Sequence, residues 1–189
     1  LKVAVKYSKV RFLNCSVEQP YSSIRSYYGR FYEAQFIAGA IAGAMACNDR
    51  IGYIASFPVF GELASINAFA LGAQMTNPRA QIELKWACVE GFPQTELLAD
   101  GIRIVSTQNA SSELNACSTN GTYLINDTGE MIPLGTHIWN WGEFYEYAIK
   151  EILSGGMKKE KNSHMALNYW LGLDSGVIGM DISARLPQG

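Results

Sequence analysis

The chain has 189 residues, of which 48% are hydrophobic and 17% are charged. This composition is typical of a folded protein of one or two small domains and excludes a disordered chain. The formal net charge of −2 gives no electrostatic reason to expect a nucleic-acid or anionic-membrane partner.

The first predicted elements surround an uncharged run of apolar residues. A strand at residues 10–15 and a loop at 17–26 precede a helix whose part 36–47 carries no charge. Twelve residues are too few to span a bilayer, which needs about 20, so this helix is predicted to be buried. Gly39 and Gly43 lie one helical turn apart beside alanines, so another backbone could approach that face closely.

Strands and helices then alternate along the chain. Strands are predicted at residues 51–55, 82–86, 102–105, 123–125, 134–139, 165–171 and 177–182, and helices at 61–75, 94–99, 111–119 and 142–153. This order predicts an α/β fold with helices on both faces of a parallel sheet. The strands at 51–55, 82–86, 102–105 and 123–125 are expected to be parallel neighbours.

Ligands of such sheets bind beyond the carboxyl ends of the strands. That rule selects the loops at residues 56–60, 87–92, 106–110 and 126–130, and it makes the aromatic Phe57 a candidate ligand-binding residue.

A second aromatic candidate follows the strand at 134–139 and opens the next helix. Trp139 and Trp141 could stack on the face of a purine or sugar, and Asn140 could bond the edge of a base. The alternative is that both tryptophans belong to the core and the helix start.

Signals for catalysis are weak. The sequence has no Walker loop and no GxGxxG, GxSxG or HExxH motif, so we expect neither an enzyme nor a cofactor. His137 lies in a predicted strand and is expected to be a packed or edge residue, and His164 a residue of a surface loop. The four cysteines form no CxxC pair and favour buried free thiols over disulfides or a metal site; they are Cys15, Cys47, Cys88 and Cys117.

Three stretches resemble the basic membrane protein family, the purine-nucleoside-receptor-like lipoproteins that serve as solute-binding components of ABC transporters. The motif YEAxxxAGxxAGxM matches residues 32–45, IGYxAxFP matches 51–58, and INAFALGAxxxNP matches 66–78, with no gap in the spacing. The likeness extends less evenly from about Arg11 to about Asp181 and would correspond to the C-terminal portion of the family.

The resemblance implies a type I periplasmic-binding-protein-like fold of two Rossmann-like lobes with the solute between them. Residues 1–47 would be the remnant of the first lobe. Residues 48–189 would be the second lobe, with hinge crossovers near 126–142 and 165–181. An incomplete first lobe would expose apolar surface and favour self-association.

The family also suggests further ligand-binding residues. Its stacking motif WxxxWFDP is matched at Trp86 and Pro93, where Phe92 could supply the ring. In the next loop, Gln108 and Asn109 could bond a base or ribose. At the family's ribose-binding GxDSD motif, Thr128 and Glu130 align with the carboxylates, and Asp127 could serve through a shift of one residue. A plain turn at 126–130 is the alternative.

The function that the resemblance implies is reversible capture of a nucleoside-like solute, without chemistry, by the binding component of an ABC importer. The full-length protein would be an extracytoplasmic, membrane-anchored lipoprotein with a permease as partner. Its signal and lipid-anchor segment is absent from this chain, whose first residues lack an apolar core. One alternative is a degenerate ligand-sensing or interaction domain of a larger regulatory protein, and another is a flavodoxin-like enzyme.

Overall fold

The computed structural model describes residues 2–7, 9–15, 24–89, 93–107, 120–155 and 168–186. The chain divides into two compact units, unit 1 with residues 1–30 and 139–178, and unit 2 with residues 31–138 and 179–189. It therefore passes between the units three times, at 30/31, 138/139 and 178/179. This division differs from the expected one at residue 47, because the long first helix packs within unit 2.

Unit 1 is built on a parallel three-stranded sheet in the order β1-β2-β8. Its elements are α1 (Lys2–Lys6), β1 (Phe12–Cys15), β2 (Ile24–Gly29), α5 (Trp141–Leu153), β8 (Asn168–Leu171) and the 3-10 helix η1 (Leu173–Ser175). Phe144 and Ala148 of α5 pack on Tyr27 and Tyr169 of the sheet. The sequence predicts a loop where β2 begins, because pairing with two neighbouring strands, and not a local pattern, makes this segment extended.

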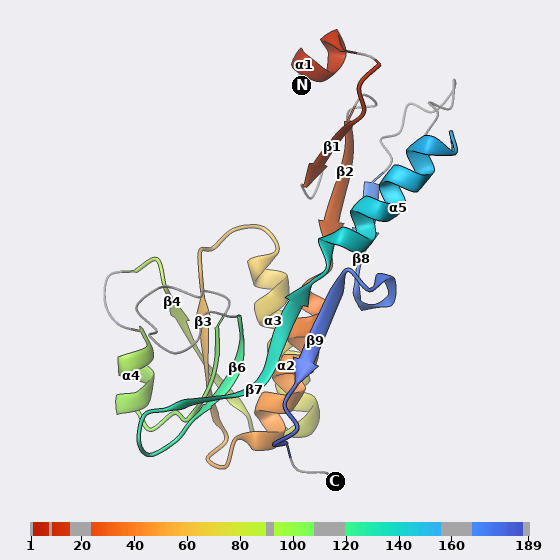
Figure 1. The fold of residues 1–189 in the computed structure, drawn as a ribbon. Coiled ribbons are helices and arrows are strands. Elements are labelled where there is room, and N and C mark those ends of the chain that lie inside the picture. Colours follow the sequence, from red (N-terminus) through yellow and green to blue (C-terminus); the bar gives the residue numbers. More distant parts are fainter. Residues whose placement is uncertain are drawn as a thin grey trace. The chain divides into compact units, whose positions relative to one another are not determined.

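Unit 2 contains a six-stranded sheet in the order β4-β3-β5-β6-β7-β9 (Figure 1). Its strands are β3 (Arg50–Ala55), β4 (Gln81–Trp86), β5 (Ile104–Thr107), β6 (Gly121–Ile125), β7 (Met131–Trp139) and β9 (Ile178–Ile182). β3 is parallel to both β4 and β5, as predicted. The helix expected at 111–119 lies outside the described residues.

The sheet is mixed, and the prediction that Tyr123–Ile125 runs parallel to its neighbours is wrong. β6 is antiparallel to β5 and to β7. The pairing with β7 follows from the short turn at residues 126–130, where Gly129 has a φ of 81°. Such a turn joins two strands as a hairpin, and hairpin strands are antiparallel.

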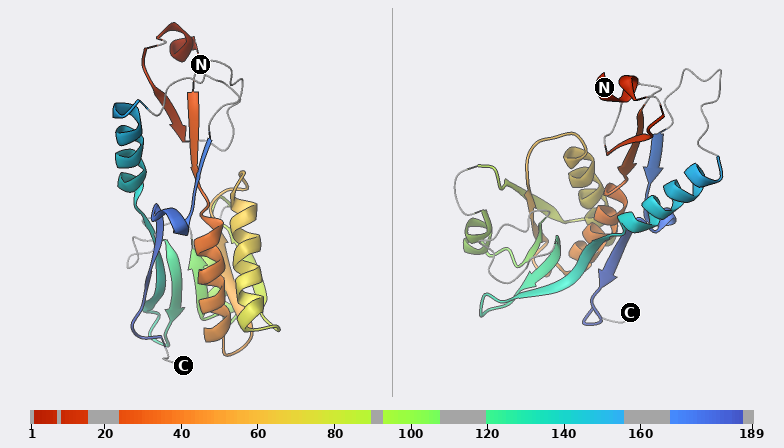
Figure 2. Two further views of the ribbon diagram at one scale, coloured as in Figure 1. Left: turned by 90° about the vertical axis from the view of Figure 1, so that its right-hand side faces the viewer. Right: turned by 45° about the horizontal axis from the view of Figure 1, so that its top comes forward.

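Helices cover both faces of this sheet, as predicted. α2 (Tyr32–Met45) and α3 (Glu62–Thr76) lie side by side on one face, as Figure 2 shows. α4 (Pro93–Ala99) covers the other face, where Leu97 packs with Ile54, Ile102 and Val105.

Glycines let α2 and α3 approach each other closely. A Cβ at Gly39 would overlap the carbonyl oxygen of Phe69 and lie 2.7 Å from the carbonyl carbon. A Cβ at Gly72 would likewise overlap the carbonyl oxygen of Phe36, and one at Gly43 that of Ala73. The close backbone approach expected from the spacing of Gly39 and Gly43 is confirmed.

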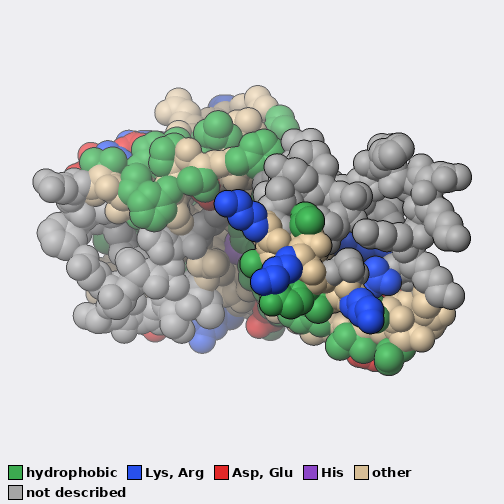
Figure 3. Space-filling model, turned by 90° about the horizontal axis from the view of Figure 1, so that it is seen from above, with side chains coloured by type: hydrophobic (Ala, Val, Ile, Leu, Met, Phe, Trp, Pro, Cys, Tyr) green, Lys and Arg blue, Asp and Glu red, His purple; other side chains and the backbone are tan. Residues whose placement is uncertain are grey.

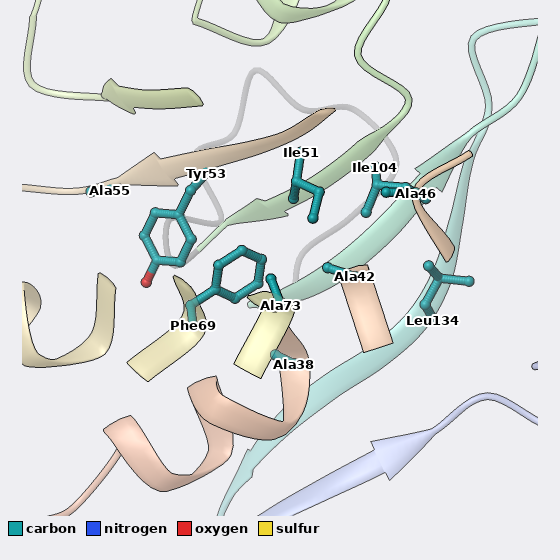
Figure 4. Close-up of a cluster of buried hydrophobic side chains, with 10 residues drawn as sticks. All are labelled: Ala38, Ala42, Ala46, Ile51, Tyr53, Ala55, Phe69, Ala73, Ile104 and Leu134. Atoms are coloured by element: carbon teal, nitrogen blue, oxygen red, sulfur yellow. The ribbon is translucent and has the colours of Figure 1, made fainter. Parts of the chain in front are cut away.

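The main core lies between these two helices and the sheet (Figure 4). The rings of Tyr53 on β3 and Phe69 on α3 meet edge to face with centroids 4.9 Å apart. Small alanines of α2 and α3 fill the rest of the space against Ile51, Ile104 and Leu134. Small side chains on the helices thus match large ones on the strands.

His137 is buried in β7, as expected for a packed strand residue. Its side chain is 9% exposed, and its ring lies 4.8 Å from the ring of Phe31 between centroids. Burial lowers the pKa of His137 to about 4. The imidazole is therefore neutral in the folded protein at physiological pH.

The cysteines differ from the prediction. Cys15, Cys47 and Cys88 are free thiols, but they are exposed and not buried, and Cys117 lies outside the described residues. Cys15 is the last residue of β1, and Cys47 lies two residues after the end of α2. At such ends, an apolar run in the sequence does not imply that the side chain is buried. Within the described ranges, no helix has the length and apolar character needed to cross a membrane.

We predict that Gly39→Ala destabilises the protein by about 1–3 kcal/mol, because its methyl group would collide with the backbone of α3. Gly142→Ala in α5 is the matched control, since nothing lies within 4 Å of the added methyl group. It should be neutral or stabilise by about 1 kcal/mol at most. Equal denaturant midpoints for the two variants would contradict the close packing of α2 on α3.

We also predict that His137 makes folding stability fall with acid. The unfolded histidine takes up a proton near its ordinary pKa of 6.5, whereas the buried one does so only near 4. The contribution of His137 to the free energy of unfolding is therefore fully present above pH 6.5. It is lost as the pH falls to 4, and the loss is about 3 kcal/mol at most. Urea unfolding of His137→Asn between pH 7 and 4 should show a smaller loss than wild type, and parallel curves would refute this assignment.

Candidate functional site

Several elements of unit 2 present their ends at one edge of its sheet. β3, β4 and β5 are parallel, so their carboxyl ends share this edge, and α3 begins there after β3. α2 runs parallel to α3, because Gly39 meets Phe69 and, one turn on, Gly43 meets Ala73. The first turn of α2 therefore lies at the same edge, which is where ligands of α/β sheets bind.

A layer of buried polar side chains occupies this edge on the helix side of the sheet. We call it the polar layer; its members are Gln35, Glu62, Ser65, Ser106, Thr122 and His137, each at most 9% exposed. On α2 and α3, Gln35 and Ser65 stand one turn before the contacts of Gly39 with Phe69. The rest of the core below this layer is hydrophobic.

The strand members of the polar layer are neighbours in the sheet. Ser106 and Thr122 pair in the register of β5 and β6, and the Thr122 hydroxyl lies 3.2 Å from that of Ser106. Ser106 is two residues from Ile104, and Thr122 is two residues from Leu124; both of these apolar side chains pack under α2 and α3. Because side chains alternate along a strand, Ser106 and Thr122 point to the same face of the sheet, toward the two helices. The backbone N–H of His137 donates to Asn120 at the start of β6.

Some atoms of the polar layer lack hydrogen-bond partners. Both amide atoms of Gln35, both ring nitrogens of His137 and Oε1 of Glu62 have none among the described residues. Burial raises the pKa of the Glu62 carboxyl to about 7. An unpartnered buried polar group costs about 1–3 kcal/mol, so these side chains are not explained by the stability of the fold.

Phe57 follows β3 and lies at the same edge, as predicted. Its side chain is 57% exposed, and Val59, Phe60 and Leu63 beside it are more exposed still. Figure 3, a view from above, shows hydrophobic side chains gathered on the surface of that side. The other candidates from these loops, Phe92, Gln108 and Asn109, lie outside the described residues.

The turn at residues 126–130 lies at the opposite edge, because β6 runs antiparallel to β5 (Figure 1). The structure therefore does not bring Asp127, Thr128 and Glu130 together with Phe57. The Asn126 side chain accepts hydrogen bonds from both backbone and hydroxyl of Thr128 and from the backbone N–H of Glu130, at 2.7–3.0 Å. Asp127 pairs with Arg103 at 3.1 Å. These contacts are those of a self-contained turn.

Trp139 and Trp141 belong to unit 1 and pack on each other. Their rings are stacked with centroids 5.0 Å apart, and Trp141 also meets Tyr27 edge to face at 5.4 Å. Trp139 rests on Gly29, where a Cβ would lie 2.9 Å from Cη2 of the indole. Trp139 remains 38% exposed, so it combines a packing role with accessible surface.

Asn140 makes structural hydrogen bonds. Its side-chain amide donates to the carbonyl oxygen of Gly176 at 3.1 Å, and its backbone N–H donates to that of Val177 at 2.7 Å. We expected the Asn140 side chain to bond the edge of a base, but its amide N–H is already used to hold the segment before β9.

Positive charge in unit 2 is concentrated away from the polar layer. Arg50 begins β3, Arg79 and Arg103 precede β4 and β5, and all three pair with acidic side chains at 2.9–3.1 Å. Lys85, near the carboxyl end of β4, pairs with Glu96 at 3.0 Å. Residues 56–61 and 87–89, which follow β3 and β4, contain neither lysine nor arginine. No group of histidine, cysteine and acidic residues in the described ranges could hold a metal ion.

Sequence reasoning missed Gln35 and Glu62. Both occupy the first turn of a helix, where polar residues are ordinarily exposed. A signal existed for Gln35, because it shares a helical stripe with Ala38 and Ala42 and with the two glycines that were expected to be buried.

Comparison with known proteins supports the resemblance seen in the motifs. A family model described as ABC transporter substrate-binding protein PnrA-like matches residues 1–90. A putative ABC transporter glucose-binding protein of Haloferax volcanii is 28% identical over 195 residues, which cover 95% of this chain and 47% of the relative. A purine-binding protein of Brucella abortus is 26% identical over 200 residues, covering 99% and 55%.

Solved structures show the same fold. A solute-binding protein of an ABC transporter system from Conexibacter woesei matches with a TM-score of 0.69 and 15% identity, over 97% of this chain and 65% of that one. A transcriptional activator of the comK gene from Bacillus halodurans matches with a TM-score of 0.71 and 17% identity, over 98% and 68%. At such identities the likeness concerns the fold alone.

The chain spans about half the length of the curated relatives it matches. The family that the motifs at residues 32–45, 51–58 and 66–78 resemble is nevertheless confirmed by the family model and by both relatives. The chain is a relative of the PnrA-like substrate-binding proteins of ABC transporters.

Proposed function

We propose that this chain is part of the solute-binding component of an ABC-type importer and that it binds an uncharged, nucleoside-like solute reversibly, without chemistry. The observation that carries the proposal is the polar layer, which gathers buried donors and acceptors at the ligand-binding edge of unit 2. The full-length protein would act outside the cytoplasm as a membrane-anchored lipoprotein and deliver the solute to a permease.

The charges near the polar layer favour an uncharged solute. His137 is neutral because burial lowers its pKa to about 4, and the amide and hydroxyl members of the layer are uncharged. Glu62, whose pKa burial raises to about 7, would repel an anion whenever it is ionised. The described loops after β3 and β4 supply no cation. A phosphate group at this edge would lose its hydration without gaining an ion pair.

Aromatic side chains would complete the recognition of a base. Phe57 offers exposed ring surface, and we propose Phe92, Trp139 and Trp141 as further stacking surfaces, with Gln108 and Asn109 as hydrogen-bonding groups. The relatives include one purine-binding and one glucose-binding protein, so nucleosides and hexoses are the solutes to compare first.

A second candidate function is ligand sensing within a larger regulatory protein. The fold is shared with a transcriptional activator, at a TM-score of 0.71. Both functions use a bound solute, and they differ in what the solute controls. A helix-turn-helix segment encoded upstream in the gene would favour sensing, and a lipobox cysteine would favour transport.

We predict that calorimetry will detect binding of adenosine, guanosine or inosine by the purified chain. The corresponding monophosphates should bind more weakly, because the described loops after β3 and β4 hold no cation and Lys85, near the end of β4, is already paired with Glu83 and Glu96. D-glucose and ribose serve as tests of sugar recognition. Tighter binding of a monophosphate than of its nucleoside would contradict an uncharged site, and an absence of heat with all of these solutes would favour a domain that has lost binding.

We further predict opposite outcomes for two of the candidate residues. Trp139→Ala should weaken nucleoside binding by about 1–3 kcal/mol if the indole stacks on a base. Asp127→Asn should leave binding unchanged, since Asp127 pairs with Arg103 in the turn at the other edge. Trp139→Phe is the control that keeps an aromatic ring. Loss of binding in Asp127→Asn with a normal melting temperature would restore the turn as a ligand site.

A further inference from the structure

The outer face of α3 carries large apolar side chains and no charge. Residues 63–76 contain no aspartate, glutamate, lysine or arginine, yet Leu63 and Leu71 are each 59% exposed. A helix on the surface of a folded protein ordinarily directs charged and polar side chains to water. α5 follows that rule, because the ion pair of Glu146 with Lys150 stands among its exposed apolar side chains. The outer face of α3 is therefore suited to contact with another apolar surface.

This face is symmetric about Asn67. Asn67 is exposed, whereas Phe69 and Gly72 on the opposite side of the helix are buried against α2 and the sheet. The surface neighbours of a helical residue stand three and four positions away in both directions. For Asn67 they are alanines at three positions and leucines at four, namely Ala64, Ala70, Leu63 and Leu71.

A symmetric face of this kind fits its own copy. In a two-fold symmetric interface the same patch serves on both subunits, and a residue on the axis meets itself. With two antiparallel α3 helices and the axis at Asn67, Leu63 of each copy would meet Leu71 of the other. Ala64 would likewise meet Ala70, and these small side chains would let the helices approach. An amide offers both a donor and an acceptor, so two Asn67 side chains could bond each other on the axis.

We propose that the outer face of α3 binds a second copy of this chain, in a two-fold symmetric dimer whose antiparallel α3 helices meet at Asn67. The proposal goes beyond solute binding and does not depend on it. The sequence predicts self-association through the incomplete first lobe at residues 1–47, whereas this surface is formed by residues 59–75 of unit 2.

The loop before α3 enlarges the contact surface. Val59 and Phe60 are exposed and would lie opposite the carboxyl-terminal end of the other α3 helix, where Met75 is exposed. The face of one helix of this length is about 22 Å long and about 10 Å wide. This is less than the roughly 800 Å² that each partner buries in a standard interface. The dimer should therefore be weak and should form over micromolar concentrations.

The first test is sedimentation velocity of the purified chain across micromolar concentrations. Wild type should shift from monomer to dimer as the concentration rises. Leu71→Glu should raise the dissociation constant at least about tenfold, because it places a charge in the apolar contact on both sides of the axis. Leu153→Glu is the matched control, since Leu153 is a still more exposed leucine of α5, and it should dimerise as wild type does.

The second test uses cysteine substitutions to locate the axis, in a chain whose four natural cysteines are replaced by serine. Asn67→Cys should form a disulfide-linked dimer on mild oxidation, because the two copies of position 67 adjoin. Gln74→Cys is the control on the same exposed face. It stands seven residues from the axis, so its two copies would be about 21 Å apart along the helices and should not be linked.

Each outcome supports or overturns the proposal. A dimer that Leu71→Glu weakens, with cross-linking at position 67 and not at 74, supports it. A wild-type chain that stays monomeric overturns it and leaves the face to a partner of another kind. A dimer that Leu71→Glu leaves unchanged, or equal cross-linking at both positions, shows association through another surface and also overturns it. If Leu71→Glu lowers the melting temperature, the cysteine pair decides, because neither of those substitutions adds charge or bulk.

Discussion

The contact of α2 with α3 is the constraint on which the structure of unit 2 depends. Glycine at positions 39, 43 and 72 brings one helix backbone against the other, with no room for a methyl group. Two helices this close occupy one face of the sheet as a single layer, and they begin at the same edge. Close packing is therefore what brings the first turns of both helices, with Gln35 and Glu62, beside the carboxyl ends of the strands.

The same arrangement divides unit 2 into an apolar part and a polar part. Below the first turns, alanines and glycines of the helices match Ile51, Tyr53 and Ile104 of the strands, and this part supplies the hydrophobic stabilisation. At the carboxyl edge, hydroxyl, amide and imidazole groups replace them and add little to stability. Under the proposed function, binding and not folding uses the hydrogen bonds of these groups.

The sequence contained enough information for the helical layer but not for the direction of every strand. Glycines at helical spacing predict a close backbone approach because few other interactions require them. Alternation predicts that 123–125 is a strand, yet periodicity is the same in both directions of a chain. The direction of β6 relative to β7 was encoded in the turn, where Asn126, Asp127 and Gly129 are hairpin residues.

The candidate site was predictable to a similar extent. The rule of strand ends placed Phe57 at the carboxyl end of β3, where it lies, but misplaced the turn at 126–130, since it assumed that β6 was parallel. Gln35 could not be recognised by its type, because a glutamine early in a helix ordinarily faces water. Its importance lies in its burial, and burial depends on α3 and the sheet, which are distant in sequence.

The packing of Trp139 on Gly29 has a consequence for how this protein can vary. Gly29, Trp139 and Ile178 each lie at or beside one of the three places where the chain passes between units, and the space above Gly29 is bounded by the side chains of the other two. The sizes of these residues are therefore coupled: a larger residue at 29 fits only beside a smaller one at 139, so the effects of changing both positions would not be the sum of the single changes.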